Sequence, residues 1–267
     1  MVKDLTTGSP ARLIIGFSLP LLAGNLFQQF YSMADTIVVG RSIGVDALAA
    51  VGSTGAISFL VLGFVIGLTG GFSVVVAQKF GAGDEQEVRR AVAMSVYLSV
   101  LLTIVLTAVS VLCTRPLLNF MQTPANIYDD AYAYIVVIFA GTGATIFYNL
   151  LSGVLRALGD SRTPLYFLIL SSVINVALDL VFILVFGMGV AGAAYATVAA
   201  QVLSGLLCLL YMAKKFPILR FHKSDWAWNG RLVVHHLRLG LPMAFQFSVT
   251  AIGVMILPGA INGFGSS

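Results

Sequence analysis

Long apolar runs separated by short polar segments make up most of the 267-residue chain. Seven of these runs are long enough to cross a bilayer, whose hydrocarbon core of about 30 Å requires about 20 apolar residues in a helix. Apolar residues follow one another continuously instead of alternating with polar ones, which excludes the strands of a transmembrane barrel. The pattern predicts an all-α membrane protein with spans at about residues 13–40, 47–80, 88–113, 128–158, 163–186, 192–214 and 239–264.

Composition supports this interpretation. Hydrophobic residues make up 58% of the chain and charged residues 10%, whereas soluble domains carry about 25% charged residues. Most of the surface must therefore face lipid. The first residues lead into an apolar run that contains Pro20 and has no small-residue cleavage site, so we expect a mature N-terminus and not a cleaved signal peptide.

Basic residues are distributed unevenly between the two sides of the predicted membrane. If the N-terminus lies inside, the inner segments hold thirteen Lys and Arg residues and the outer segments hold two, Arg41 and Arg115. Because positively charged loops stay in the cytoplasm, we expect a cytoplasmic N-terminus and a multi-pass protein of the cell (plasma or inner) membrane. The net charge of +4 then reflects loops facing an anionic leaflet and does not indicate nucleic-acid binding.

The order of the spans predicts three parts: a six-helix lobe at residues 1–214, a cytoplasmic or interfacial linker at 215–238, and the first helix of a second lobe at 239–267. The last span resembles the first, since both have a basic start, an early Gly and a Leu-Pro pair, at Leu19-Pro20 and Leu241-Pro242. Parallel repeats of this kind occur in transporters. We therefore expect a truncated, pseudo-symmetric protein that lacks its second lobe. The linker histidines at 222, 235 and 236 are expected to be solvated or interfacial.

Polar residues inside the spans are the best guide to function, because hydrocarbon disfavours an ionisable group by about 2.5–3.5 kcal/mol. Two carboxylates lie within spans, Asp35 in the first and Asp179 in the fifth. In the first span Asn25, Gln28, Ser32 and Asp35 are spaced by three, four and three residues. This spacing places them within an arc of about 80° on a helix.

Two more spans carry polar stripes of the same kind. They comprise Ser172, Asn175 and Asp179 in the fifth span, and Thr197, Gln201 and Ser204 in the sixth. A rise of about 1.5 Å per residue puts both acids and Thr197 in the outer half of the membrane, with Asn149 of the fourth span nearer Asn175. Three facing stripes can enclose a hydrated cavity.

Each polar residue also has a purely structural interpretation. Asp35 could extend from near the interface to water, and single amides or hydroxyls such as Asn149, Asn175, Thr197 and Gln201 often link helices by hydrogen bonds. Their occurrence together with two acids favours a cation or proton site. Carboxylate, amide and hydroxyl oxygens suit hard cations, and a buried Asp can load and release a proton.

Glycine and proline positions add two structural expectations. Gly63, Gly67 and Gly71 form a small-xxx-small repeat that predicts close helix packing. Pro20 interrupts the hydrogen bonding of its helix, so it either shapes the bundle or supplies a hinge.

No motif indicates an enzyme. The string at 187–192 matches the letters of the dinucleotide fingerprint, but it joins two membrane spans and the next acid after Asp179 is Asp225, so a nucleotide site is rejected. Metal-ligand clusters, nucleophile elbows and phosphate loops are missing from the sequence. We expect a non-enzymatic protein without a cofactor, other than a coupling ion.

Four segments resemble the multidrug and toxic compound extrusion (MATE) family of cation-coupled antiporters: SLPLLAGNLFQQFYSMADTIVVG, VAQKFGAGDEQEVRRA, LRALGDSRTP and NVALDLVFILVFGMGVAGAAYATVAAQ. The resemblance extends over nearly the whole chain. It implies two six-helix lobes, of which the chain covers the first and one helix of the second, and an acidic site in the first lobe that binds sodium ions or protons. By position, it implies a site formed by Asp35, Asn175, Asp179 and Thr197, supported by Asn149.

The stripes and the resemblance together predict export of amphipathic organic cations, driven by protons or sodium ions and achieved by alternating access. Asn25, Gln28, Ser32 and Gln201 are expected to line the substrate cavity, with Pro20 as the hinge. Expected partners are the bilayer, small amphipathic cations and the missing lobe. One alternative is a lipid-linked precursor flippase of the related superfamily, disfavoured because the outer half of the spans holds no Lys or Arg beyond Arg41. Another is a non-transporting membrane scaffold or half-transporter.

Overall fold

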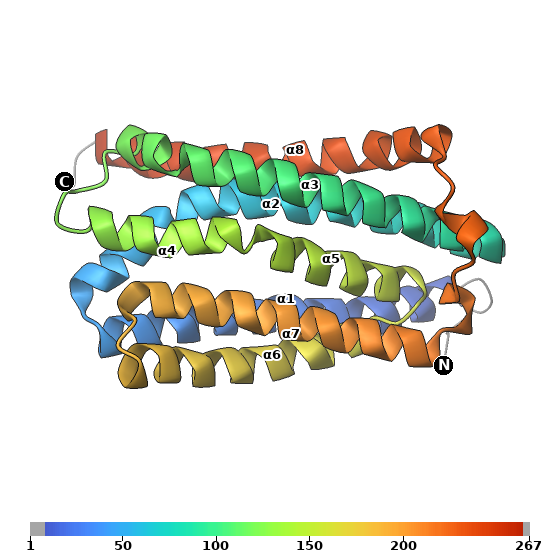
Figure 1. Cartoon of the computed structure of the whole chain (residues 1–267), viewed down its shortest axis with the longest axis horizontal. Coiled ribbons are helices and arrows are strands. Elements are labelled where there is room, and N and C mark those ends of the chain that lie inside the picture. The colour runs from blue at the N-terminus through green and yellow to red at the C-terminus, as the bar shows by residue number, and fades with distance from the viewer. Residues whose placement is uncertain (1–8, 264–267) are drawn as a thin grey trace.

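The computed structural model describes residues 9–263, with the side chains of residues 10, 31 and 254–263 excepted, and these residues form an all-helical bundle (Figure 1). The helices are α1 (Pro10–Ser42), α2 (Val45–Gly81), α3 (Glu85–Phe120), α4 (Tyr128–Ala140), α5 (Thr142–Ala157), α6 (Arg162–Leu180), the π-helix η1 (Val181–Val185), α7 (Gly189–Lys215), the short 3-10 helices η2 (Pro217–Leu219) and η3 (Lys223–Trp226), and α8 (Gly230–Gly263).

The helical membrane fold expected from hydropathy is confirmed. Within the described residues, five helices are long and apolar enough to cross a bilayer, and the bent pair α4 and α5 brings the number to six. A seventh apolar run forms α8. Its expected end at Phe264 lies outside the described residues, and so does Lys3, one of the thirteen inner basic residues. The helices extend a few residues beyond most of the expected boundaries.

The fourth predicted span is broken into two helices. α4 and α5 meet at Gly141 with a bend of 45°. A Cβ atom at this position would collide with the side chain of Val198 on α7. Glycine therefore lets α7 pass close to the break, a contact between distant segments that a hydropathy pattern does not contain.

The fifth predicted span changes its helical geometry near the end. After Leu180 the chain continues as the π-helix η1, in which the N–H of Phe186 bonds to the carbonyl of Val181 at 3.0 Å. Short π segments often occur at functional sites. This one begins two residues after Asp179.

Small residues bring α2 and α8 into backbone contact, as the glycine repeat predicts. A Cβ on Gly67 would lie 2.5 Å from the carbonyl oxygen of Met243, and a Cβ on Gly71 would meet the backbone of Gly240. Close approach without side chains between the helices allows many weak dispersion contacts. The first helix of the predicted second lobe is therefore packed tightly on the six-helix lobe.

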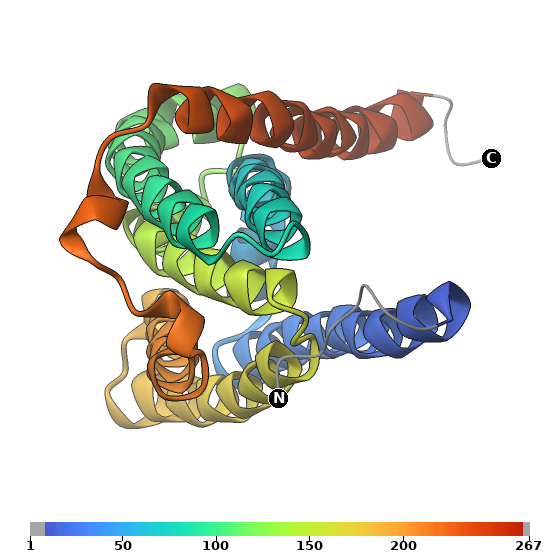
Figure 2. The ribbon, with the colours of Figure 1, turned by 90° about the vertical axis from the view of Figure 1, so that its right-hand side faces the viewer.

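One end of the bundle collects the basic residues, and we call it the basic end. It holds the end of α2, the start of α3, the end of α5, the start of α6, the end of α7 and the start of α8 (Figure 1, at the right). Seen from this end, α2 and α3 lie with α8, whereas α1, α6 and α7 lie together on the other side of α5 (Figure 2). The far end carries Arg41 and Arg115.

The segment predicted as a linker is ordered and docked at the basic end. Asp225 is 1% exposed, accepts a hydrogen bond from the N–H of His222 at 2.8 Å, and pairs with the guanidinium Nε of Arg89 at 3.1 Å. The hydroxyl of Tyr97 donates to the carbonyl of Trp226 at 3.1 Å. The linker is also shorter than predicted, because α8 begins at Gly230 and not near residue 239.

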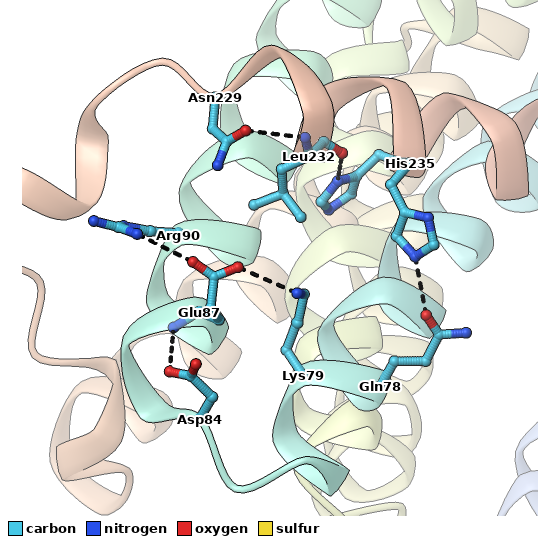
Figure 3. Close-up of polar contacts among 9 residues, drawn as sticks. Gln78, Lys79, Asp84, Glu87, Arg90, Asn229, Leu232 and His235 are labelled. Carbon is cyan, nitrogen blue, oxygen red and sulfur yellow. Dashed lines mark hydrogen bonds and ion pairs between the residues drawn. The ribbon is translucent and has the colours of Figure 1, made fainter.

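A second polar group fixes the turn between α2 and α3 (Figure 3). Asp84 caps α3, since its Oδ1 accepts the N–H of Glu87 at 3.0 Å. The Glu87 carboxylate bridges Lys79 at 3.2 Å and Arg90 at 3.1 Å. Nearby, the His235 ring contacts the Gln78 side-chain oxygen at 3.0 Å.

The expectation that all three histidines are solvated or interfacial is wrong for His236, which is buried between helices. This ring is fully buried, its Nδ1 lies 2.7 Å from the carbonyl of Leu232, and its Nε2 lies 3.0 Å from the hydroxyl of Ser95 on α3. A carbonyl only accepts, so Nδ1 carries a proton. The ring also meets Phe72 edge-on at 5.6 Å between centroids, and so joins α2, α3 and α8.

Candidate cation site

The two acids predicted within the membrane spans face one another. Asp35 lies on α1 and Asp179 on α6, two helices that pack together, and the side chains are 8% and 0% exposed. Their carboxyl groups lie within hydrogen-bonding reach. Two carboxylates at this distance repel each other, so one of them must hold a proton or both must share a cation.

Asn175 connects Asp179 to the next helix. It is fully buried one helical turn before the acid. With its amide oriented to satisfy both groups, Nδ2 donates to Asp179 Oδ2 at 3.1 Å and the amide oxygen accepts the N–H of Thr197 at 3.1 Å. The Thr197 hydroxyl lies 3.4 Å from the same amide. These contacts join α6 to α7 beside the acids.

Part of this cluster is left without a hydrogen-bond partner. Among the described residues, Oδ1 of Asp35 and Oδ1 of Asp179 are buried and accept no hydrogen bond. Buried polar atoms are normally paired, so an unpaired carboxylate oxygen indicates a ligand position. Carboxylate, amide and hydroxyl oxygens fit a proton or a hard cation such as sodium. In the described part of the chain, no three His, Cys, Asp or Glu side chains are placed so that they could hold a metal ion.

Asn149, the fifth residue implied by the resemblance, lies in a different environment. Its Nδ2 donates to the carbonyl of Thr145 on its own helix at 2.8 Å. Its side chain lines a cavity of about 130 Å³ together with Gln28, Ser172 and Gln201. Gln201 also has a buried Oε1 without a partner among the described residues.

A larger cavity of about 780 Å³ lies beside α1, α2, α5, α6 and α8. Three of the predicted cavity residues line it: Asn25, Gln28 and Ser32. The fourth, Gln201, lines the smaller cavity. Gln28 and Asn149 line both cavities. Neither acid lines either cavity. The structure therefore places the candidate cation site and the cavity on different parts of the lobe.

Pro20, the predicted hinge, lies inside the continuous helix α1 and lines the larger cavity. Most of the large side chains along α1 are exposed, including Leu19, Leu22 and Leu26 at about 60%. A helix with few lateral contacts and a missing internal hydrogen bond can bend more easily than its neighbours. Asp35 lies on the same helix, four turns after the proline.

Sequence reasoning missed Arg156, which lines the larger cavity from the last turn of α5. On sequence grounds it is one of the thirteen inner Lys and Arg residues, because hydropathy reports the depth of a residue but not the direction of its side chain. The available signal was its position before the polar turn Gly159–Ser161, with Ser152 one turn earlier on the same helical face.

Comparisons with known proteins agree with the fold. The model of the MatE family matches residues 20–181. The probable multidrug resistance protein YpnP of Bacillus subtilis is 33% identical over 266 residues, which covers 98% of this chain and 58% of that protein. The solved structure of a MOP superfamily transporter from Pyrococcus furiosus superposes with a TM-score of 0.88 at 29% identity, over 95% of this chain and 56% of the other.

A structure described as the outward-facing conformation of a multidrug resistance MATE family transporter of the MOP superfamily superposes with a TM-score of 0.87, also at 29% identity, over 94% of this chain and 55% of that chain. The chain thus spans little more than half the length of the proteins that it matches.

Proposed function

This chain belongs to the MATE family of membrane transporters, which are not enzymes, and we propose that it carries the ion-coupling site of a multidrug exporter. The exporter uses protons or sodium ions to expel amphipathic organic cations by alternating access. Asp35, Asn175, Asp179 and Thr197 hold the ion. The bilayer surrounds the lobe, and a second lobe completes the substrate pathway.

One observation carries the proposal: two buried carboxyl groups from different helices face each other, and each retains an unpaired oxygen. Such a pair is unfavourable unless a proton or cation neutralises it. The fold would gain stability from replacing it with apolar residues, so its presence is best explained by a ligand that enters and leaves.

Movement of α1 provides a route from ion binding to the cavity. Binding of the ion neutralises Asp35 and Asp179, and α1 bends at Pro20, where an internal hydrogen bond is missing. Asn25, Gln28 and Ser32 lie between these two points and line the cavity, so the bend repacks the cavity wall. Ion and drug then favour different conformations, and this difference in affinity couples them.

The orientation in the membrane belongs to the same proposal. Basic residues gather at one end of the bundle, at the ends of α2, α5 and α7. Positive segments remain on the cytoplasmic side. We place the basic end and the start of α1 in the cytoplasm, which puts the acid pair in the outer half of the membrane.

The experiment is drug resistance in cells that express the full-length protein with Asp35→Asn or Asp179→Asn. Each change preserves side-chain shape and removes the ability to bind an ion or release a proton, so resistance should fall to the level of cells without the transporter. Asp130→Asn, an exposed acid at the start of α4, is the matched control and should retain resistance. Normal resistance in both test variants, at normal membrane abundance, would contradict the proposal.

A further inference from the structure

Arg156 is the one charged side chain among the residues that line the two cavities. It lies in the last turn of α5 and is half-buried. The rest of the wall consists of amides, hydroxyls and apolar groups, Asn25, Gln28, Ser32, Ser58 and Leu62 among them. The electrostatic character of the cavity wall therefore depends on a single cation.

The guanidinium of Arg156 is directed into the lobe. Its Nη2 lies 3.9 Å from the position of a Cβ atom at Gly153, one turn deeper along α5. An arginine that serves only to reach water at the membrane surface would extend the other way, beyond the helix end. Gly153 itself packs against Ser73 of α2, so the guanidinium lies beside the junction of two helices.

No carboxylate neutralises this cation within the described residues. The ion pairs there join Lys79, Arg89 and Arg90 to acidic partners, and none includes Arg156. Asp160, the closest acid along the chain, caps α6: its Oδ1 accepts the N–H of Thr163 at 3.0 Å and its Oδ2 accepts the Thr163 hydroxyl at 2.6 Å.

Neighbouring hydroxyl and amide groups are already bound to backbone carbonyls. The hydroxyl of Ser152 donates to the carbonyl of Asn149 at 3.2 Å, the Asn149 amide donates to Thr145, and the Tyr148 hydroxyl donates to Pro164 at 3.5 Å. The planar guanidinium offers five donors in a fixed arrangement that matches a carboxylate or phosphate. It is the group best able to bind an incoming anion.

We propose that Arg156 is an anion-recognising position of the substrate cavity, so that this transporter selects amphipathic molecules that carry an acidic group, a carboxylate or a phosphate, in addition to any positive charge. The proposal rests on the proposed export function and makes the cavity favour zwitterions over simple cations. The anionic group binds at the basic end of the cavity, and the aromatic or aliphatic body of the substrate lies along the apolar wall toward Ser32.

The test compares two dyes that differ at one group. Rhodamine 110 carries a carboxylate, and rhodamine 123 is its methyl ester. Binding of each dye to the purified full-length protein is measured by fluorescence polarisation, for the unchanged protein and for Arg156→Gln, Arg156→Lys and Arg162→Gln. Arg162 is exposed at the start of α6 and is the matched control.

We expect Arg156→Gln to weaken rhodamine 110 binding about tenfold, the loss typical of a charge-assisted hydrogen bond, and to change rhodamine 123 binding by less than about twofold. Arg156→Lys should retain part of the preference for the carboxylate, and Arg162→Gln should retain all of it. An unchanged ratio between the two dyes in Arg156→Gln would overturn the proposal, and so would a parallel loss of both, which would assign Arg156 a structural role.

Competition in the unchanged protein gives a readout that needs no variant. 1-Naphthoate and 1-naphthyl phosphate should displace rhodamine 110, and the more effective of the two identifies the acidic group that Arg156 prefers. Displacement by neither compound contradicts the proposal.

Failure of the proposed export function is recognised separately, because rhodamine 123 transport would then be unchanged in Asp35→Asn. An unchanged dye ratio in Arg156→Gln, in a protein whose rhodamine 123 transport is ion-dependent, overturns the anion position alone.

Discussion

The polar groups at the acid pair and those at the basic end differ in how completely they are paired. Around Asp35 and Asp179, on the side of the bundle formed by α1, α6 and α7, buried oxygens lack partners among the described residues. Around α2, α3 and α8, Asp225 is held by Arg89 and by a backbone N–H, and His236 uses both ring nitrogens.

This difference separates a site from a scaffold. A fully paired buried group stabilises one arrangement and resists exchange, whereas an unpaired one is unfavourable until a ligand binds. The chain therefore holds its linker and the start of α8 with paired groups at the basic end, and it leaves carboxylate oxygens available to a ligand at the acid pair.

The largest expected difference is between the effect of a substitution in the acid pair on transport and its effect on stability. Asp179→Asn should abolish ion-driven drug transport and leave the melting temperature of the purified protein unchanged or raised, because removal of a buried repulsion offsets the lost carboxylate. Transport in proteoliposomes and thermal unfolding in detergent measure the two effects. A large fall in melting temperature would show that the acid pair belongs to the scaffold.

Asp225 should behave in the opposite way. Asp225→Ala removes the buried carboxylate that lies closest to the half-buried Arg89 and releases the linker, so we expect a loss of about 3 kcal/mol in stability, measured by thermal or denaturant unfolding. Glu85→Ala is the matched control, because Glu85 is 70% exposed and lies 3.9 Å from the same arginine. Equal losses of stability from the two changes would mean that burial does not strengthen the Arg89–Asp225 ion pair.

The same pair has a defined pH dependence. The N–H of His222 holds the pKa of Asp225 below its ordinary value; burial opposes this shift, and Arg89 supports it. A lowered folded-state pKa stabilises the fold above the unfolded value of about 3.9, and this contribution is lost as the pH falls through the folded-state pKa. The linker should therefore stay docked at neutral pH and loosen only in stronger acid, as protease cleavage within residues 216–229 would detect.

His236 provides a smaller scaffold effect. His236→Ala leaves a cavity beside Phe72 and removes hydrogen bonds to Ser95 and Leu232, so a loss of about 2 kcal/mol in unfolding free energy is expected. His235→Ala, at a less buried position, should have little effect. The comparison tests the buried member of an adjacent pair against the half-buried one.

The smallest predicted effect concerns the glycine contact of α2. Gly71→Ala forces a methyl group into the backbone of Gly240 and should destabilise α8 docking by about 1–2 kcal/mol. Gly55→Ala, where no heavy atom lies within 4 Å, should be neutral or slightly stabilising. Loss of docking would appear as faster hydrogen exchange in α8.

Hydropathy predicts the order and approximate position of the apolar spans because the bilayer requires apolar runs of a fixed length. Helical spacing selects Asp35, Asn175 and Asp179 because each lies on a polar stripe. Features that depend on contacts between distant helices could not be predicted in this way. The break at Gly141 depends on Val198, the burial of His236 depends on Ser95, and the inward direction of Arg156 depends on the packing of α5 against α2.

Ion-driven flux tests the central claim most directly. Rhodamine 123 uptake is measured in proteoliposomes of the full-length protein under a sodium gradient and, separately, a pH gradient, with the unchanged protein and with Asp35→Asn. We predict that at least one gradient drives uptake by the unchanged protein and that neither drives uptake by the variant. Uptake that is independent of both gradients, or equal in the two proteins, would contradict the assignment of the Asp35–Asp179 cluster as the coupling site.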